Sequence, residues 1–484
     1  MLDYKHIQNY RENNRVEAKK AVGGLPHSIW ETYSAFANTI GGVILLGVEE
    51  NMKDHTLHPI DLPHAQEMVE QFWNMVNDPK KASVNILTSK DVQIIDADNC
   101  RIIAITVPRA MRQDRPVYVD GDPIKGTYRR NGEGDYHCDR ETVEAMLRDA
   151  QTKAQDLQTF EQLDISALDL DSLRGYRVRM KGKRPGHALE SLKDEEFLLG
   201  LGAMAPGEDG RAHPTAAGLL MFGREYEIVR CFPSYSLEYI ERMGEDGAIT
   251  DRIDSGAGSW SGNLYDFYVR VYERLNREVR PPQLPEEGGR VGERPVHAAL
   301  REALSNCLIN ADYRAEIGVR VVRTRRGVIF TNPGGFRVAV EKAKVGGVSD
   351  PRNATLMRLF SMINVSSRTG SGLSNIYAAW KKYGWAEPIL REEFAPDRIT
   401  IALGFVEPEG APNAAARSGA ELMRIRREEI IHYLTLGVSA TSAELARSLN
   451  LPREEVRGLL RRLMKDGLVV GKGPNRVRRY QLRA

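Results

Sequence analysis

The chain has 484 residues, of which 42% are hydrophobic and 28% charged, and a net charge of +2. A chain of this length is too long to fold around a single hydrophobic core, which predicts three or four domains. The composition excludes a largely disordered chain. Four scattered cysteines without C-x-x-C spacing argue against zinc as a cofactor and against a disulfide framework.

The amino-terminal residues M-L-D-Y-K-H lack the apolar core of a signal peptide. No stretch of the chain approaches 18 apolar residues, so no membrane span is predicted. We therefore expect a soluble, cytoplasmic protein with no membrane partner.

Acidic and basic residues surround one helix and one strand between Glu12 and Glu50. The helix is predicted from Pro26 in its first turn and from an apolar face at Ile29, Tyr33, Phe36 and Ala37. Asn38, Gly41 and Gly42 are expected to end it, and Val43–Val48 predicts a strand buried on both faces. Carboxylates and ammonium groups on such a frame suit phosphate chemistry or phosphate binding.

The strings V-E-A-K and S-A-F-A-N-T-I-G-G-V-I-L-L-G-V-E-E resemble the Schlafen AlbA-type domain over residues 1 to about 150. A strand at Arg101–Val107, the string G-T-Y-R-R-N-G and a helix opening at Asp139 agree with it. In nuclease members, three acids form a metal-dependent RNA-cutting site, and the resemblance places them here at Glu12, Glu17 and Glu50. The third is usually Asp, and the longer Glu can disturb the geometry of bound Mn²⁺ or Mg²⁺.

Two other interpretations of this region stay open. The resemblance also allows plain nucleic-acid binding, through Lys19, Lys20, Arg129 and Arg130. Alternatively, Glu17 and Lys19 are a structural pair, Glu12 is a solvated acid, and the short basic pairs are solvated faces.

The middle of the chain, from about 165 to 405, contains one helix with a polar face and two glycine turns. Pro214–Gly218 followed by L-L-M-F-G predicts a helix entering an apolar strand. Leu300–Asp312 predicts a helix on which Glu302 and Asn306 share a face, where a carboxylate can orient water and an amide oxygen can hold Mg²⁺. Val328–Phe336 predicts a strand running into one glycine turn, and the string from Arg368 predicts a second that opens a helix.

In this order, the elements resemble the GHKL-type ATP-binding fold of gyrase, Hsp90 and histidine kinases, an α/β sandwich. The resemblance assigns Glu302 as the catalytic base of an ATPase, Asn306 as the Mg²⁺ ligand, and Gly334, Gly335, Gly370 and Gly372 to the glycine turns. The adenine-binding Asp of the fold is replaced by Asn332, which accepts fewer donors than a carboxylate. The glycines are otherwise explained as folding elements. The chain contains no G-x-x-x-x-G-K-[ST] motif, so a P-loop motor, and with it helicase activity, has no support.

Residues 406–420 are rich in Pro, Gly and Ala and predict a flexible linker. The segment 421–484 contains fourteen Arg or Lys against seven Asp or Glu and has the pattern of a winged helix-turn-helix. Thr441–Glu444 predicts a capping box, and Val456, Leu459, Leu460 and Leu463 predict the buried side of a helix from Arg453. The basic residues expected to contact DNA lie on this helix and on a β-hairpin wing: Arg453, Arg457, Arg461, Lys472, Arg476, Arg478 and Arg479. A module for protein interaction or dimerisation is the alternative.

The sequence thus predicts an α+β multidomain protein with a Schlafen AlbA-type domain at 1–150, a GHKL-like domain at 165–405, and a winged helix-turn-helix at 421–484. The first functional hypothesis is a transcriptional regulator that binds DNA or RNA, with a middle domain that senses ATP or holds a homo-oligomer such as a dimer. The alternative is a metal-dependent ribonuclease directed at tRNA in stress or phage defence. A scaffold that retains both folds only for assembly is a third hypothesis.

Overall fold

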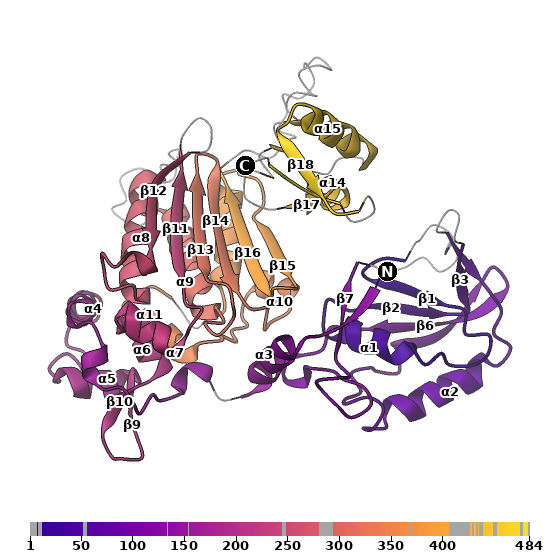
Figure 1. Cartoon of the computed structure of the whole chain (residues 1–484), viewed down its shortest axis with the longest axis horizontal. Helices are drawn as coiled ribbons and strands as arrows, with labels where there is room; N and C mark the ends of the chain where they lie inside the picture. The colour runs from indigo at the N-terminus through magenta and orange to yellow at the C-terminus, as the bar shows by residue number, and fades with distance from the viewer. Residues whose placement is uncertain are drawn as a thin grey trace. The chain divides into compact units, whose positions relative to one another are not determined.

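The computed structural model describes most of the chain, and it separates into two compact units, residues 1–154 and 155–484 (Figure 1). The residues it describes are 7, 12–51, 56–132, 134–152, 154–243, 248–279, 294–366, 369–405, 426–427, 430–431, 434, 439–448, 453–474 and 478–482. The predicted linker 406–420, together with Arg368 and Arg476, lies outside these residues. Within the described part, no helix is long and apolar enough to cross a membrane.

The first unit is built on a four-stranded sheet with the order β1-β2-β6-β5. Strand β1 is parallel to β2, and the other neighbours are antiparallel. Its elements are β1 (Val16–Lys19), α1 (Ile29–Ala37), β2 (Gly42–Leu46), β3 (Val48–Glu50), β4 (Leu57–Pro59), α2 (Ala65–Val76), β5 (Val92–Ala97), β6 (Cys100–Val107), β7 (Tyr128–Asn131), β8 (Gly134–His137) and α3 (Arg140–Ala150).

Helix α1 confirms the predicted apolar face, but its boundaries differ from the prediction. The helix begins at Ile29, three residues after Pro26, so the proline precedes the helix instead of lying in its first turn. Asn38 is the C-cap in right-handed geometry, and Gly41 takes the left-handed conformation with φ of +73°. The predicted strand is also divided, because Gly47 with φ of +78° separates β2 from β3.

The second unit contains a six-stranded sheet with the order β12-β11-β13-β14-β16-β15, in which only the β11–β13 pair is parallel. Its strands are β11 (Leu237–Arg242), β12 (Ile249–Asp254), β13 (Val319–Thr324), β14 (Gly327–Pro333), β15 (Ile389–Glu393) and β16 (Arg398–Gly404). The helices are α4 (Leu170–Lys183), α5 (Asp194–Leu201), α6 (Ala216–Phe222), α7 (Glu225–Cys231), α8 (Leu264–Glu278), α9 (Pro295–Asn310), α10 (Val340–Val345), α11 (Ala354–Met362) and α12 (Gly372–Lys382). A small hairpin pairs β9 (Met204–Pro206) with β10 (Ala212–Pro214).

The sheet and the helices form two layers around the largest core, with α8 and α9 along one face of the sheet (Figure 1). Side chains of β14 alternate, so Val328 and Phe330 join the core with the helices while Ile329 packs with Ala402 in a separate cluster. This α/β sandwich is the architecture that the sequence predicts for the middle of the chain.

The predicted strand after Gly218 is wrong, because Leu219–Phe222 belongs to helix α6. Thr215 caps this helix, its hydroxyl accepting a hydrogen bond from the Gly218 amide at 3.1 Å. Every residue of α6 is buried, so the apolar run reflects burial on all sides and carries no strand periodicity.

The last described elements form a small module with its own core. They are β17 (Ala440–Thr441), α14 (Ser442–Ser448), α15 (Arg453–Lys465), β18 (Val469–Lys472) and β19 (Arg479–Leu482), with the strands ordered β17-β19-β18. The predicted capping box is confirmed: the Thr441 amide donates to the Glu444 carboxylate at 2.9 Å and the Glu444 amide donates to the Thr441 hydroxyl at 3.2 Å. The predicted buried side of α15 is also confirmed, since Val456, Leu459, Leu460 and Leu463 are buried.

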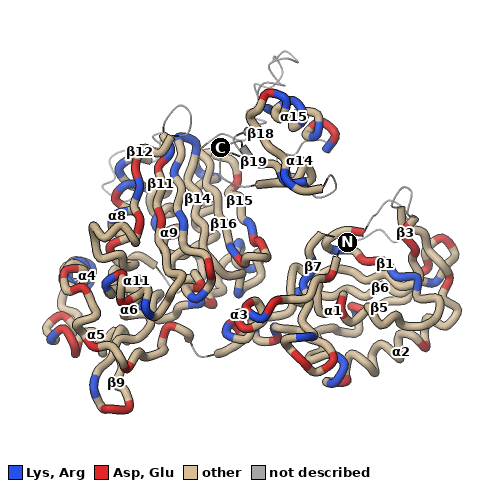
Figure 2. The backbone as a smooth tube through the Cα atoms, viewed as in Figure 1, with Lys and Arg blue, Asp and Glu red and all other residues tan. Residues whose placement is uncertain are grey.

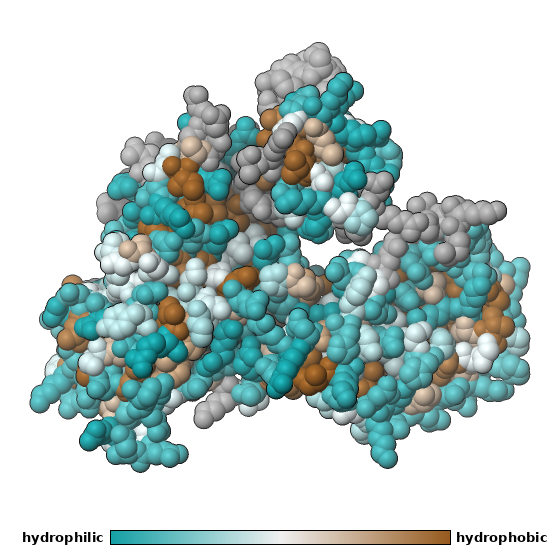
Figure 3. All heavy atoms as spheres, viewed as in Figure 1, coloured by the Kyte–Doolittle hydropathy of each residue, from teal (hydrophilic) through white to brown (hydrophobic). Residues whose placement is uncertain are grey.

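In the view of Figure 3, the drawn surface is mostly hydrophilic and its hydrophobic residues lie in scattered groups. Large exposed apolar side chains such as Val178, Tyr226 and Val345 come from separate elements. Scattered apolar residues of this kind are normal on protein surfaces.

Candidate functional site

Three polar side chains project from one face of α9, because Glu302, Asn306 and Asn310 are spaced four residues apart. The Asn306 amide nitrogen Nδ2 lies 3.4 Å from Oε1 of Glu302, to which it donates. Nδ2 of Asn310 donates to the Asn306 carbonyl oxygen at 3.0 Å. These contacts fix the amides along the helix and leave the Asn306 side-chain oxygen available to a cation or donor.

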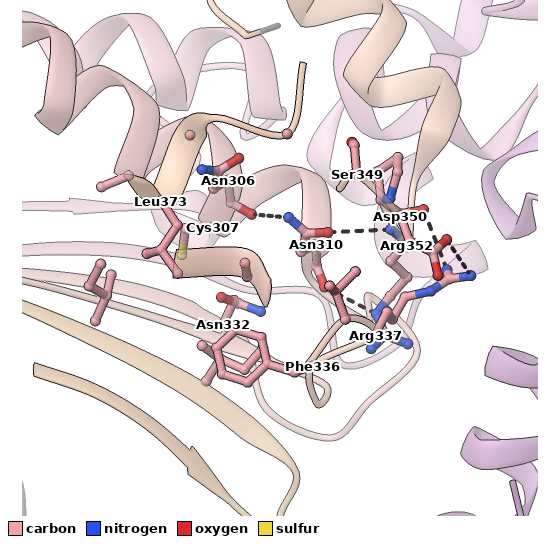
Figure 4. A pocket seen from close by; sticks show the side chains of 18 of the residues that line it. Asn306, Cys307, Asn310, Asn332, Phe336, Arg337, Ser349, Asp350, Arg352 and Leu373 are labelled. Carbon is pink, nitrogen blue, oxygen red and sulfur yellow. Dashed lines mark hydrogen bonds and ion pairs between the residues drawn. The ribbon is translucent and has the colours of Figure 1, made fainter. Parts of the chain in front are cut away.

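This face of α9 forms one wall of a cavity of about 170 Å³ (Figure 4). The other walls come from the end of β14, the segments 335–338 and 348–352, and the start of α12. The residues predicted for a nucleotide site that line it are Glu302, Asn306, Asn332, Gly335, Gly370 and Gly372, whereas Gly334 lies just outside the lining. Residues more than sixty positions apart in the sequence are thus brought to one cavity.

Both predicted glycine turns need glycine. Gly334 has φ of +93° and Gly370 has φ of +68°, conformations that side-chain-bearing residues rarely adopt. A Cβ on Gly334 would lie 2.7 Å from Nη2 of Arg352, and one on Gly370 would lie 2.5 Å from the carbonyl oxygen of Val348. Both turns are therefore packed closely against neighbouring chain segments, and neither position has room for a side chain.

Burial raises the pKa of the Glu302 carboxyl above its ordinary value. The nearby Arg301 charge and the hydrogen bond from Asn306 act in the opposite direction and are weaker. A carboxyl with a raised pKa at the wall of a largely apolar cavity is suited to accept a proton from water. This is the role that the sequence assigns to Glu302.

Asn332 is buried at the end of β14 and faces the cavity (Figure 4). Its Nδ2 donates to the carbonyl of Pro333 at 3.1 Å, which directs Oδ1 away from that carbonyl. A single amide oxygen can accept one hydrogen bond from an exocyclic amine such as that of adenine.

The sequence did not single out the arginines that hold the far wall of the cavity. Arg352 is buried, and its guanidinium donates to the carbonyl oxygens of Asn310 and Gly335, each at 3.0 Å. Arg337 pairs with Asp350 at 3.4 Å (Figure 4). Asn310 could have been found from its spacing with Asn306, but the arginine contacts join segments with no sequence signal in common.

In the first unit, Glu17 and Arg130 form a buried structural network. Nη2 of Arg130 lies 2.8 Å from Oε2 of Glu17, and Nη1 lies 3.0 Å from Oδ1 of Asp135. The Arg130 side chain is 1% exposed, so it is not placed to contact a nucleic acid. Lys19 pairs with Glu17 at 3.0 Å, as the structural interpretation of that pair predicts. Glu17 therefore balances two cations.

The charge of Glu12 interacts with those of Glu17 and Glu50. Burial raises the pKa of the Glu12 carboxyl, with smaller contributions in the same direction from Glu17 and Glu50, while the Ala18 amide, which donates to Glu12 at 2.9 Å, opposes the shift. Among the residues that the structure describes, however, no three His, Cys, Asp or Glu side chains are arranged to hold a metal ion. Glu12, Glu17 and Glu50 are therefore not gathered into a metal-binding group in this structure, and their role as metal ligands stays a prediction.

The remaining basic residues predicted in the first unit differ in exposure. Lys20 is exposed and pairs with Glu49 at 2.5 Å, and Arg129 is half-buried. The structure therefore leaves Lys20 as the most accessible of these cations for a phosphate.

Several Lys and Arg positions lie along α15 of the small carboxyl-terminal module (Figure 2). Of the predicted basic residues that the structure describes there, most are exposed. Arg453, Arg457 and Arg461 are exposed on α15, and Lys472 is exposed at the end of β18. Arg478 and Arg479 are half-buried, and Arg479 donates to the carbonyl of Ser439 at 2.7 Å. The exposed arginines of α15 are therefore better placed than Arg479 to meet an external polyanion.

Comparison with protein families agrees with part of these expectations. Residues 9–139 match the family described as Schlafen, AlbA_2. The chain therefore contains a Schlafen AlbA_2 domain. Residues 315–402 match the family described as putative ATP-dependent DNA helicase recG C-terminal, and residues 144–238 match a domain of unknown function, DUF8451. The second match includes Asn332 and both glycine turns but begins after α9.

Among solved structures, the DIP2311 protein from Corynebacterium diphtheriae is similar at 17% identity, with a TM-score of 0.40, over 97% of this chain and 95% of that one. The N-terminal domain of a putative ATP-dependent DNA helicase RecG-related protein from Nitrosomonas europaea is 27% identical over 28% of this chain and 94% of its own, with a TM-score of 0.23. These TM-scores do not establish a shared fold. No match was found among curated protein sequences.

Proposed function

We propose that this protein is a nucleic-acid-binding regulator whose middle domain binds ATP. The observation that carries the proposal is the convergence of Glu302 and Asn306 with the two glycine turns around one cavity. The recG-type family match over residues 315–402 supports it, because that region supplies Asn332 and both turns. Exposed backbone at glycine turns and a helix start is a common way to bind phosphate.

The roles of the cavity residues follow from their chemistry. Asn332 accepts a hydrogen bond from adenine, and Gly335 and the turn at Gly370–Gly372 offer backbone amides to the phosphates. The Gly334 amide is not available, because it donates to the Asp397 carbonyl at 2.8 Å. The Asn306 oxygen holds the Mg²⁺ that accompanies the nucleotide, for which few protein ligands are needed. Glu302 accepts the proton of an attacking water if the nucleotide is hydrolysed.

The cavity is smaller than the 300–1,000 Å³ or so typical of pockets for drug-sized ligands. At about 170 Å³, it accommodates a base more readily than a whole nucleotide. ATP binding is therefore coupled to movement of a wall, and the second glycine turn, which is pressed against Glu302, is the segment that we expect to move.

Isothermal titration with ATP and Mg²⁺ tests this proposal on the full chain. Binding by the wild type that is lost in Asn306→Ala supports it. If neither protein releases or takes up heat, the middle domain is not a nucleotide site.

For nucleic acid, we propose that the carboxyl-terminal module is a winged helix-turn-helix that binds duplex DNA through α15. Its support is the capped α14, the exposed arginines of α15 and the β18–β19 hairpin that follows. The AlbA_2 domain is proposed as a second nucleic-acid contact, in which Lys20 is accessible and Arg130 is not.

The ribonuclease alternative has one observation in its favour, the raised pKa of Glu12 beside the charges of Glu17 and Glu50. Against it stands the pairing of Glu17 with Lys19 and Arg130. Incubating tRNA with the protein and Mn²⁺ separates the proposals: cleavage that is lost in Glu12→Gln favours the ribonuclease, and intact RNA removes it.

A further inference from the structure

A second pocket of the middle domain, with a volume of about 480 Å³, lies among helices α4, α8 and α9. Each helix contributes side chains at regular helical spacing. Arg179 and Lys183 come from α4, Tyr268 and Tyr272 from α8, and Arg301 from α9. The packing of these three helices thus forms most of the pocket, and residues 363–365 complete it.

The lining of this pocket is strongly cationic. Arg294 adds a fourth cation to Arg179, Lys183 and Arg301, and no carboxylate lines the pocket within the part of the chain that the structure describes. A lining whose described charged residues are all positive raises the local electrostatic potential and favours anions, although Arg301 is also held by the protein, donating to the Asn364 carbonyl at 3.2 Å. Helix residues that only face solvent need not all carry the same sign of charge.

Arg179 shows that the pocket is built to present a cation. Its guanidinium lies 5.8 Å from the ring centre of Tyr268, which is stacked on Tyr272 with 5.7 Å between ring centres and 7° between planes. Nη1 of Arg179 is buried, and among the described residues it has no hydrogen-bond partner. A buried guanidinium nitrogen without an acceptor is costly unless a ligand or water supplies one.

We propose that this pocket binds the phosphate groups of an oligophosphate ligand, separately from the ATP cavity. Arginine and lysine side chains are the usual partners of phosphate oxygens, and the volume falls within the range of roughly 300–1,000 Å³ that small-molecule sites occupy. The stacked tyrosines offer a flat apolar surface beside the cations, which suits a ligand that also carries a planar base.

The two cavities share helix α9 but use different faces of it. Arg294 and Arg301 line the cationic pocket, whereas Asn306 and Asn310 line only the ATP cavity. Substitutions in α4 can therefore remove cations from the second pocket without touching the first.

The test is isothermal titration of the full chain with sodium tripolyphosphate, at low salt and with EDTA to remove Mg²⁺. We expect binding by the wild type, a loss of about tenfold in affinity for Lys183→Gln, and no measurable binding for the Arg179→Gln/Lys183→Gln double variant. Arg174→Gln is the matched control, because Arg174 is also on α4 but is exposed and paired with Asp171. Lys183 is exposed, so its replacement leaves the core intact, and melting curves confirm folding of each variant.

Binding that survives in the double variant, or no binding by the wild type, overturns the proposal. So does binding that is lost in Asn306→Ala, because the phosphate then enters the ATP cavity. Fluorescence anisotropy with an oligo(dT) of about twelve nucleotides, the size of a typical binding site for single-stranded DNA, shows whether the bound phosphates belong to a nucleic acid or to a free oligophosphate. If the double variant also loses oligo(dT), the pocket holds a nucleic-acid backbone; if only tripolyphosphate is lost, its ligand is a free oligophosphate.

Discussion

Gly372 and Glu302 are in such close contact that no side chain fits between them. A Cβ atom on Gly372 would lie 2.2 Å from Oε1 of Glu302 and 2.7 Å from Nδ2 of Asn306. The start of α12 and the polar face of α9 are therefore in direct contact, although seventy residues separate them in the sequence. The absence of a side chain at Gly372 is what allows the second glycine turn to close over the carboxylate.

Gly372→Ala is expected to lower the affinity for ATP by about tenfold or more, equal to ~1.4 kcal/mol, because Glu302 and Asn306 must move aside. The stability of the fold should change little, since the displaced atoms are the ends of side chains and alanine is favoured over glycine in a helix by up to about 1 kcal/mol. Titration calorimetry and thermal melting measure the two effects. Gly458→Ala is the control, because a Cβ there meets nothing within 4 Å. Equal ATP affinity in wild type and Gly372→Ala would contradict the prediction.

Glu302→Gln is expected to make stability depend less on pH. Burial raises the pKa of Glu302 in the folded state above its ordinary value of 4.5, so the folded protein holds this proton more tightly than the unfolded chain does. The resulting stabilisation is complete below pH 4.5 and is lost as the pH rises through the folded-state pKa. The variant, which cannot ionise, should therefore match the wild type in acid and exceed it at neutral pH.

Thermal unfolding of both proteins between pH 4 and pH 8 measures this difference, followed on the transition of the second unit. Glu316→Gln, which alters an exposed carboxylate of the same unit, should show no such divergence. If the difference in melting temperature between Glu302→Gln and the wild type becomes smaller as the pH rises, the prediction is contradicted, because a carboxyl whose pKa is raised by burial must cost more stability at higher pH.

Arg130→Met is expected to destabilise the AlbA_2 domain by about 3–5 kcal/mol, since it leaves Glu17 and Asp135 without their buried partner. Lys20→Met removes an exposed ion pair and should cost about 0–1 kcal/mol. Denaturant unfolding of the full chain compares the two. The reverse order of effects would mean that Arg130 is a surface ligand and not part of the interior.

Arg457→Gln and Arg461→Gln are each expected to weaken binding of duplex DNA and to reduce the slope of log affinity against log salt by about 1. The reason is that each removes one exposed positive charge of α15 that can neutralise a phosphate. Fluorescence anisotropy across a salt series provides the measurement. Arg230→Gln, an exposed and paired arginine outside the module, is the control. An unchanged slope in both α15 variants would leave this helix with a role in protein contact.

The sequence predicted the elements whose signals are local. The capping box at Thr441–Glu444, the buried side of α15 and the spacing of Glu302 and Asn306 depend on residues within one or two helical turns, so they can be recognised without tertiary information. The same holds for the glycine turns that contain Gly334 and Gly370, because glycine adopts a positive φ without steric cost. The helix α6 was mistaken in part for a strand, since a short, fully buried apolar run has no periodicity to distinguish the two.

Only the tertiary structure decided which charged residues serve the fold and which face solvent. Arg129 and Arg130 are neighbours in the sequence, yet Arg130 is buried and pairs with Glu17, a contact between distant parts of the chain that no local pattern encodes. The arginine contacts around the cavity beside α9, and the cationic pocket between α4, α8 and α9, likewise depend on the packing of distant segments. The free energy of a charge depends on its burial and its partners, and both are fixed only when the chain has folded.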